Sequence, residues 1–399
     1  MPQLTSGHEI TLLRNGEQFF PALISAIDAS VDEVRLETYI FHFDRSGESV
    51  AHALVCAAQR GARVYLVMDG IGSPPVPPQW VQTFAQAGVS WQCFSPLGRL
   101  GLLVPVRWRR LHRKLCVVDG RVAFCGGINI LDDRWDMHQG ALESPRLDFA
   151  VQVKGPLVRE IHQAMLQFWT RLQATKAIEH LAFEQARQTL KQGKVAVLPD
   201  AAAHKHDMGL RAAFLVRDNV RNRTRIERAY CKAIADAREE VLIANAYFLP
   251  GRKLRHALMH AAQRGVSVRL LLQGRYESFL QFHAYRPVYG KLLAAGVEIF
   301  EYKLGFLHAK VAVIDREWAT VGSSNLDPLS LLLAREANVV VESRPFASQL
   351  RTELLHELQT HASPLVAQTH AQRPWTQRCL DHLAFAAVRC FLFLTENRY

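Results

Sequence analysis

The chain contains an internal duplication. Residues 52–61 read HALVCAAQRG and residues 256–265 read HALMHAAQRG, so the two segments are identical at eight of ten positions. A match of this length between distant segments indicates two copies of one folding unit. A chain of 399 residues also has room for two domains of ordinary size, each with its own hydrophobic core. We therefore expect a fold built from two similar halves.

Each copy of the repeat lies between two apolar runs. These are VRLETYIFHF (34–43) and VYLVMDG (64–70) in the first half, and VLIANAYFL (241–249) and VRLLLQG (268–274) in the second. Helical spacing of Val50, Leu54 and Ala57 predicts an amphipathic helix between the runs, whereas continuous apolar runs are typical of buried strands. The order strand, helix, strand predicts an α/β protein in which each half has a mostly buried mixed sheet flanked by helices.

A second pair of segments carries polar residues within apolar sequence. LHRKLCVVDG at 111–120 and LHAKVAVIDR at 307–316 share the pattern His-x-Lys-x4-Asp, and an asparagine follows each histidine by seventeen positions. One such pattern arises by chance in a chain of this length with a probability on the order of a few per cent, so two copies need a common cause. The shared residues are His112, Lys114, Asp119 and Asn129 in the first half, and His308, Lys310, Asp315 and Asn325 in the second.

These residue types suit a reaction at phosphorus. Residues two apart in a strand point to the same face, so each histidine should lie beside a lysine. Lysine neutralises the non-bridging oxygens of a phosphate, asparagine adds neutral donors, and an imidazole with a pKa near ~6.5 attacks phosphorus or moves a proton. If the halves pack face to face, one histidine can form a covalent phosphohistidine. The other can protonate the leaving alkoxide and then deprotonate the incoming water or alcohol.

Other interpretations of these motifs stay open. Histidine and aspartate could bind a metal ion, but each lysine would repel a cation, so we expect a site that needs no metal and no cofactor. A single histidine in a strand is more often structural than catalytic, an objection that the repetition weakens. Asp119 and Asp315 precede turns in VDG and IDR, so we expect them to support the site as turn formers.

The charge balance favours an anionic partner. Lys and Arg number 48 against 37 Asp and Glu, and the net charge of +11 would suit nucleic acid or acidic lipid. A surface that binds nucleic acid should interleave basic residues with stacking aromatics, but the arginines near His112 alternate with aliphatic residues. We therefore expect an anionic membrane surface as partner, and no nucleic acid.

The sequence predicts contact with a membrane from its surface. Seven scattered cysteines without zinc-site spacing and an N-terminus unlike a signal peptide predict a reducing cytosolic setting. No apolar run reaches the roughly 18 residues of a spanning helix. The candidates for membrane contact are the loop 95–110, where leucines alternate with arginines, and the tail after Pro374, whose apolar residues have helical spacing. Packing of either segment against the protein is the alternative.

Several stretches resemble a known superfamily. LHRKLCVVD with GGIN, and LHAKVAVID with GSSN, resemble the paired HKD motifs of the phospholipase D superfamily. The run HAKVAVIDREWATVGSSNLDPLSLLLAREANVVV, together with NAYFLPG and NGEQFFPALISAI, is similar to the bacterial cardiolipin synthases, most of all the cardiolipin synthase B type. The likeness spans nearly the whole chain apart from a connecting segment and the C-terminal tail.

The resemblance implies two phospholipase D-like α/β/α domains, residues 1–173 and 209–368, related by a pseudo-twofold axis and sharing one active site. Residues 174–208 would form a connecting helix and linker, and 369–399 an amphipathic tail. The implied activity is transphosphatidylation through a phosphatidyl-histidine intermediate, with phosphatidylglycerol as a phospholipid substrate and a primary alcohol as acceptor. The implied location is peripheral, on the cytoplasmic side of the bacterial inner membrane. A hydrolase or a nuclease of the same superfamily is the alternative, and a binding module without activity is disfavoured because both motifs are complete.

The resemblance also implies roles for further residues. A carboxylate downstream of each motif would orient the histidine of that motif, and Asp148 and Glu336 match these positions. Ser323 would give a hydroxyl donor to the phosphate from the second half only, because the first half has Gly127 in its place. 

The superfamily favours the histidine of the first motif for attack on phosphorus. His112 is therefore expected as the nucleophile and His308 as the general acid and base. The symmetry of the sequence also allows the reverse, because each histidine has a lysine, an asparagine and a carboxylate at corresponding positions.

Overall fold

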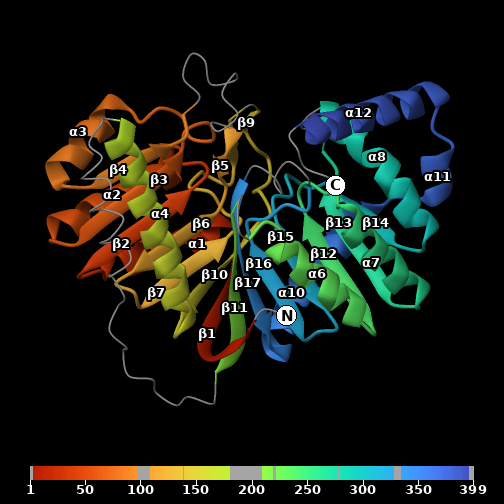
Figure 1. Cartoon of the computed structure of the whole chain (residues 1–399), viewed down its shortest axis with the longest axis horizontal. Helices are drawn as coiled ribbons and strands as arrows, with labels where there is room; N and C mark the ends of the chain where they lie inside the picture. Colours follow the sequence, from red (N-terminus) through yellow and green to blue (C-terminus); the bar gives the residue numbers. More distant parts are fainter. Residues whose placement is uncertain are drawn as a thin grey trace.

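The computed structural model describes residues 3–96, 108–137, 139–179, 209–218, 222–275, 279–327 and 334–394. Its main element is a mixed β-sheet made of two halves that are joined edge to edge (Figure 1). The strand order is β4-β3-β2-β6-β7-β10-β1 in the first half and β14-β13-β12-β15-β16-β17-β11 in the second. The two orders correspond strand for strand, as the internal duplication predicts.

The first half runs from β1 to α4. Its elements are β1 (Thr5–Arg14), α1 (Asn15–Asp28), β2 (Glu33–Thr38), α2 (Arg45–Gln59), β3 (Arg63–Asp69), α3 (Pro78–Ala87), β4 (Ser90–Phe94), β5 (Arg110–Leu111), β6 (Lys114–Val118), β7 (Val122–Gly126), β8 (Trp135–Asp136), β9 (Gly140–Ala141), β10 (Phe149–Lys154) and α4 (Leu157–Glu179).

The second half repeats this order and adds a C-terminal extension. Its elements are β11 (Leu210–Arg217), α6 (Arg225–Asp236), β12 (Glu240–Asn245), α7 (Arg252–Gln263), β13 (Ser267–Gln273), α8 (Phe279–Ala294), β14 (Glu298–Tyr302), β15 (Lys310–Ile314), β16 (Trp318–Gly322), β17 (Ala334–Glu342), α10 (Arg344–His361), β18 (Ala362–Pro364), α11 (Ala367–Ala371) and α12 (Trp375–Leu394).

The predicted strand, helix, strand unit is confirmed in both halves. β2 pairs in parallel with β3, and β12 with β13, and α2 and α7 make the connections. The helices start close to the ends of the preceding strands. At the start of α2, Asp44 accepts a hydrogen bond from the backbone of Gly47, and a Cβ at Gly47 would lie 1.7 Å from the carbonyl oxygen of His42. The turn therefore requires glycine there.

Both predicted strands end earlier than the apolar runs do. β2 ends at Thr38 and β12 at Asn245, whereas the runs continue to 43 and 249. The residues beyond the strands enter loops that are held by side-chain hydrogen bonds as well as by isolated backbone ones. Thr38 donates to the carbonyl of Ile40, and Asn245 accepts from the backbone of Leu326. These loops form one wall of the site described below.

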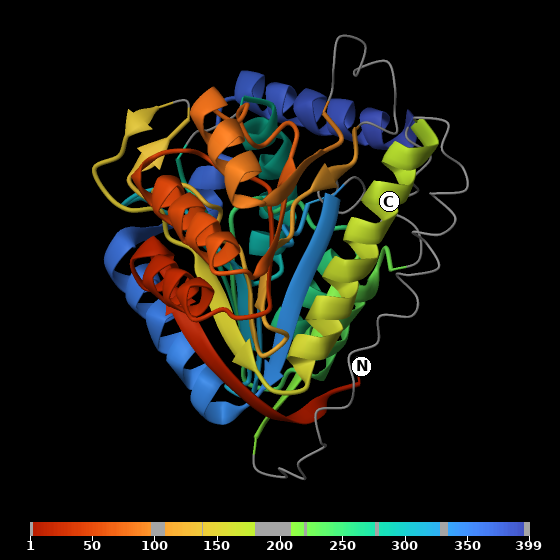
Figure 2. The same cartoon turned by 90° about the vertical axis from the view of Figure 1, so that its left-hand side faces the viewer.

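The halves meet along β1 and β11 and across their inner faces. β1 pairs antiparallel with both β10 and β11, so it continues the sheet from one half to the other. One hydrophobic cluster contains residues of both half-sheets together with α4 and α10, which flank the strands on opposite sides (Figure 2). Two further clusters lie on the outer faces, one beneath α1, α2 and α3 and the other beneath α6, α7, α8 and α12. The inner cluster fixes the halves against each other.

Two predicted segment boundaries fall inside helices. Position 173 lies within α4, which continues to Glu179, and position 369 lies within α11. Most of the predicted connecting segment, residues 180–208, and most of the predicted membrane loop, residues 97–107, lie outside the described residues.

The C-terminal helix α12 packs on α8. Ala384 and Val388 are buried in this contact, whereas Leu383 remains 68% exposed. Part of its apolar stripe therefore covers the protein. Across the described ranges, the helices all fall short of the length and apolar character needed to cross a bilayer.

Candidate active site

Both HKD motifs begin at the same edge of the sheet. β6 runs antiparallel to β2, and β15 runs antiparallel to β12, so the starts of β6 and β15 lie beside the ends of β2 and β12. His112 and His308 stand two residues before these starts. Each therefore lies where a buried strand opens into loops.

Each histidine is held by the backbone of the opposite half. The N–H of His112 donates to the carbonyl of Arg335 at 3.0 Å, next to the pairing of β5 with β17. The N–H of His308 donates to the carbonyl of Leu147 at 2.8 Å, next to the bridge between Leu147 and Leu307. The two crossings bring both motifs into one site.

The carboxylates are exchanged between the halves in the same way. Nδ1 of His308 is 2.6 Å from Oδ2 of Asp148, and Nδ1 of His112 is 2.9 Å from Oε1 of Glu336. The expectation that each carboxylate orients the histidine of its own half is therefore wrong. Asp148 and Glu336 directly follow Leu147 and Arg335, the residues whose carbonyls hold the opposite histidines. A carboxylate at Nδ1 fixes the ring and leaves Nε2 for chemistry.

The two lysines lie beneath the histidines. Nζ of Lys114 donates to the carbonyl oxygen of His112 at 2.6 Å, and Nζ of Lys310 donates to that of His308. Both side chains are buried, at 5% and 0% exposure. Burial lowers the pKa of Lys114 to about 7, although Glu336 acts in the opposite direction.

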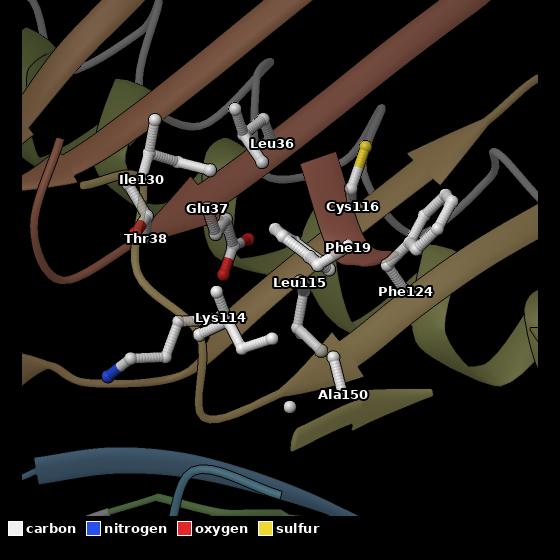
Figure 3. Close-up of a pocket in the computed structure, with 12 residues that line it drawn as sticks. Phe19, Leu36, Glu37, Thr38, Lys114, Leu115, Cys116, Phe124, Ile130 and Ala150 are labelled. Carbon is white, nitrogen blue, oxygen red and sulfur yellow. The ribbon is translucent and has the colours of Figure 1, made fainter. Parts of the chain in front are cut away.

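Lys114 also lines a small, mostly apolar cavity in the first half. It is lined by Lys114 together with Glu37, Phe19, Phe124 and other apolar residues of the half-sheet. The Lys114 side chain runs along the cavity with its amine pointing away from the two phenylalanine rings (Figure 3). Nζ lies 5.3 Å from the ring centre of Tyr39, so the amine faces an aromatic ring on its other side.

The charges of both halves act on each histidine. Burial lowers the pKa of His308 well below its usual range, and Lys310, Lys114, Arg146 and His112 lower it further. Burial also lowers the pKa of His112, against the opposing effect of Glu336. The histidine side chains keep 13% and 18% exposure, whereas Glu336 and Asp148 are almost fully covered. The site thus presents two accessible, largely neutral imidazoles at neutral pH.

The two carboxylates differ in protonation. Burial raises the pKa of Asp148 to about 7, although Lys310 opposes the shift. Burial would also raise the pKa of Glu336, but His112, Lys114 and the hydroxyl of Ser323 outweigh it, and the pKa is lowered. The pKa shifts of the two carboxylates therefore have opposite directions, upward for Asp148 and downward for Glu336.

Ser323 and Gly127 explain part of this difference. Ser323 is fully buried, its Oγ donates to Glu336, and it accepts from the backbone of Ala337. Ser323 follows β16 and directs its hydroxyl to Glu336 on β17, so it supports the carboxylate that holds His112, and donation to a phosphate stays a prediction. At the corresponding position, a Cβ on Gly127 would lie 2.2 Å from Oδ1 of Asp148. Asp148 fills the space that a serine would need.

The asparagines stand at the same edge, after β7 and β16. Oδ1 of Asn129 accepts a hydrogen bond from the backbone of Ile40 at 3.2 Å. The side-chain N–H donors of Asn129 are therefore the two on Nδ2. Asn325 is 2% exposed and directly precedes Leu326, which is tied to Asn245. The side chain of Asn129 thus helps to hold the loop that follows β2, and in the second half it is Asn245 that holds the segment after β16.

The two aspartates of the motifs lie at the far ends of β6 and β15. Asp119 accepts backbone hydrogen bonds from residues 31–33, and Asp315 accepts them from residues 238–240, at 2.8 to 3.0 Å. Both have φ of 50°, in the left-handed region where aspartate is tolerated in turns. They fix the turns that precede β2 and β12, and the structure does not bring them to the histidines.

Two residues near the histidines were not predicted from the sequence. The ring centre of Tyr39 lies 4.9 Å from that of His112, and Arg146 is among the groups that lower the pKa of His308. Tyr39 directly follows the end of β2, where a polar residue after a buried strand is a signal for a site. Arg146 lies two positions before Asp148, and its proximity depends on contact between the halves.

Within the described ranges, the histidines of the motifs do not lie in a cluster of three residues that could share a metal ion. Of the described residues, His356, Glu357 and His361 on α10 form the group whose ligand atoms are close enough to share an ion. Glu357 there contacts Arg14 and accepts from His361, so its oxygens already have partners.

The chain matches the family described as "Cardiolipin synthase, PLD-like domain" over residues 23–169 and 230–358. It is 38% identical over 386 residues to cardiolipin synthase B of Salmonella typhi, covering 96% of this chain and 89% of the relative. It is 37% identical over 387 residues to cardiolipin synthase B of Escherichia coli K12, with the same coverage. A cardiolipin synthase of Geobacillus sp. (strain WCH70) is 30% identical over 94% of this chain and 71% of the relative.

The fold also matches a solved structure. The phosphatidylserine synthase of Haemophilus influenzae superposes with a TM-score of 0.70 at 13% sequence identity, covering 98% of this chain and 96% of the other. At that identity the likeness concerns the fold alone. The sequence matches cover nearly the whole chain and both HKD segments, so this protein belongs to the cardiolipin synthase family of phospholipase D-like enzymes.

Proposed function

We propose that this protein is a phosphatidyltransferase that makes cardiolipin or a related anionic phospholipid from phosphatidylglycerol. The observation that carries the proposal is the exchange of carboxylates between the halves. It places two oriented imidazoles and two buried lysines in one site, which is the set of groups that a reaction through a phosphohistidine needs. The names of the cardiolipin synthase B relatives support the same substrate class.

The first step forms the covalent intermediate. Nε2 of one histidine attacks the phosphorus of the donor lipid, a P–N bond forms, and the P–O bond to the leaving alcohol breaks. The second histidine gives its proton to that oxygen. Lys114 and Lys310 neutralise the phosphate oxygens throughout.

The second step reverses these roles at a new oxygen. The hydroxyl of the acceptor loses its proton to the second histidine and attacks phosphorus, and the P–N bond breaks. If the donor and the acceptor are both phosphatidylglycerol, the products are cardiolipin and glycerol. Atoms balance without a metal or another cofactor.

We assign His112 as the nucleophile and His308 as the general acid and base. Glu336 is ionised and backed by Ser323, so it fixes a proton on Nδ1 of His112 and leaves a lone pair on Nε2. Asp148 retains a proton near neutral pH and shares it with His308. The pair therefore holds a proton that Nε2 of His308 can release to the leaving alkoxide. The asymmetry between Ser323 and Gly127 therefore supports the division of roles.

We further propose that the enzyme acts from the cytoplasmic surface of the inner membrane as a peripheral protein. The net charge of +11 favours an anionic lipid surface. Trp135, Met137, Ile71 and Leu304 are each between 40% and 43% exposed, and they lie in segments that extend beyond the strands at the active-site edge. Exposed apolar residues beside the site suit an enzyme whose substrates remain in a bilayer.

Mass spectrometry of products from vesicles of phosphatidylglycerol tests the function. We expect cardiolipin and glycerol in equal amounts with the wild-type protein, and neither product with His112→Ala. Phosphatidic acid as the main product would show hydrolysis and overturn the transferase proposal. Cleavage of single-stranded DNA without any lipid product would show that the protein is a nuclease.

A further inference from the structure

A second cavity lies away from the histidines, between α8, α11 and α12. It has a volume of about 420 Å³ and is open to solvent. α8, α11 and α12 lie together at one corner of the second half, whereas β6 and β15 lie at the centre of the molecule (Figure 1). None of the residues that line this cavity belongs to the active site described above.

The cavity is rich in positive charge. Three arginines line it, Arg286, Arg373 and Arg378, together with one carboxylate, Asp381, and Arg286 also pairs with Glu301 at 2.9 Å. Asp381 contacts Arg373 at 2.7 Å and His283 at 2.7 Å, so its charge is already shared between two partners. Arg378 is exposed, and it has no carboxylate partner in the part of the chain that the structure describes. Burial lowers the pKa of Arg373, Asp381 opposes that shift, and the charges of Arg286 and Arg378 add to it.

A buried histidine adds a polar group to the same wall. His370 is 7% exposed, its Nε2 contacts Arg373 and the carbonyl of Arg286, and its Nδ1 has no hydrogen-bond partner among the described residues. Burial and the charge of Arg373 lower the pKa of His370. Guanidinium groups and a ring nitrogen around one cavity are suited to a phosphate group, which accepts several hydrogen bonds at once.

The rest of the cavity is apolar. On α8 it is lined by Pro287, Gly290, Leu293 and Ala294. Two exposed apolar residues stand at its border: Trp375 is 75% exposed and lies one turn before Arg378 on α12, and Val366 is 47% exposed and precedes the lining residue Ala367. Tryptophan beside arginine is typical of residues at the headgroup level of a bilayer.

We propose that this cavity is a second phospholipid site, which binds the phosphate of an anionic lipid headgroup outside the active site. The arginines and His370 would bind the phosphate, the apolar wall of α8 would contact the glycerol backbone, and Trp375 would lie among the headgroups. Through this site the enzyme would hold an anionic lipid while a separate substrate molecule reacts at the histidines. The site goes beyond the proposed transferase activity and does not depend on it.

Calorimetric titration with short-chain phosphatidylglycerol, kept below its critical micelle concentration, tests the proposal on the full-length protein. In a His112→Ala background, which cannot turn the lipid over, we expect the Arg378→Glu chain to bind one lipid fewer than the chain with Arg378, because reversing the charge of one guanidinium should weaken the cavity by about tenfold or more. Arg389→Glu makes the same charge change on α12 without lining the cavity, and it should retain both sites. Arg378 is exposed, so its replacement should leave the unfolding temperature unchanged.

The other outcomes are equally informative. An undiminished number of bound lipids on Arg378→Glu, or an equal loss in Arg378→Glu and Arg389→Glu, would overturn the cavity site. In the His112→Ala background, one bound lipid in all, and none after Arg378→Glu, would support the cavity and contradict lipid binding at the histidines, so failure of the two proposals is distinguishable. Titration with inorganic phosphate and with glycerol phosphate separates the sources: binding as tight as that of the lipid would show a site for a soluble phosphate and overturn the lipid assignment.

Discussion

Nδ1 of His308 lies 2.6 Å from Oδ2 of Asp148, a residue of the opposite half of the molecule. The equivalent contact joins His112 to Glu336 at 2.9 Å, so each half supplies the carboxylate that the other half needs. A separated half would contain a histidine without its carboxylate and without the backbone carbonyl that holds it. The active site therefore requires both halves, docked in one arrangement.

Loss of either histidine should abolish transfer. His112→Ala removes one chemical role and His308→Ala removes the other, and neither role has a substitute in the site. We expect each variant to lose at least about 10²-fold in rate, and the double variant to lose little more, because residues that act as a unit fail together. Initial rates of cardiolipin formation measure this. A single variant that keeps more than about a tenth of the rate would contradict the shared site.

The crossed pairing predicts opposite responses to the leaving group. Asp148→Asn should impair the acid, His308, and Glu336→Gln the nucleophile, His112, each by about 10² to 10⁴-fold with phosphatidylglycerol. A phosphatidyl ester of p-nitrophenol needs little protonation when it leaves. We expect it to restore much of the rate in Asp148→Asn and none in Glu336→Gln.

Two observations check this assignment. Glu342→Gln, on the same strand as Glu336 but paired with Arg211 away from the site, should behave as the wild type. Mass spectrometry of trapped protein locates the covalent adduct. A phosphohistidine at position 308 in His112→Ala, with none at 112 in His308→Ala, would reverse the assigned roles.

The activity should fall as the pH rises through about 7. The pKa of Asp148 is raised to about 7, so the pair that it forms with His308 holds the proton for the leaving group below that pH and loses it above. Burial lowers the pKa of His112 from its usual value of 6.5, so the nucleophile stays neutral at pH values somewhat below 6.5. The rate with phosphatidylglycerol, measured from pH 5 to 9, should decline on the alkaline side, and Asp148→Asn should lack that decline.

The p-nitrophenyl ester is the control for the pH profile. Lys114 also has a pKa of about 7, and its loss of charge would weaken phosphate binding with any substrate. A decline that is equally steep with the p-nitrophenyl ester would therefore assign the alkaline limb to Lys114 rather than to Asp148.

Gly127→Ser should be more harmful than Ser323→Gly. A Cβ at Gly127 would lie 2.2 Å from Oδ1 of Asp148, so the new side chain displaces the carboxylate from His308, and we expect a loss of about 10²-fold or more. Ser323→Gly removes one hydrogen bond to a charged carboxylate, which is worth about 1.5 to 3 kcal/mol, or roughly 10 to 150-fold. Rates on both substrates, with unfolding temperatures as the control for folding, measure the two effects. Full activity in Gly127→Ser would show that Asp148 is not confined as the structure indicates.

Chelation should leave the activity intact. In the proposed mechanism the lysines supply the positive charge that a metal ion gives in other phosphoryl-transfer sites, and they would repel a cation from the same place. We expect equal rates before and after dialysis against EDTA. Loss of turnover in EDTA, with recovery on addition of a divalent ion, would refute the proposed chemistry.

Much of the fold follows from the sequence because its signals are local. The duplicated helix and its flanking apolar runs predict two half-sheets, and both appear as the units β2–α2–β3 and β12–α7–β13. The turn role of Asp119 and Asp315 also follows from short-range sequence, since an aspartate in a tight turn binds nearby backbone N–H groups. Periodicity and turn chemistry depend on neighbours along the chain, so sequence alone reports them.

The assembly of the site depends on contacts that no local pattern encodes. His308 and Asp148 are 160 positions apart, and their pairing arises only because the inner faces of the two half-sheets pack together. The sequence places Asp148 and Glu336 downstream of their own motifs, which suggests pairing within each half. Docking exchanges them. Three other features exist only in the folded protein. They are the burial that raises the pKa of Asp148 and lowers that of Lys114, the orientation of Ser323 toward Glu336, and the cationic cavity beside α12. Desolvation and the mutual effect of charges are properties of the packed interior, so no local sequence pattern reports them.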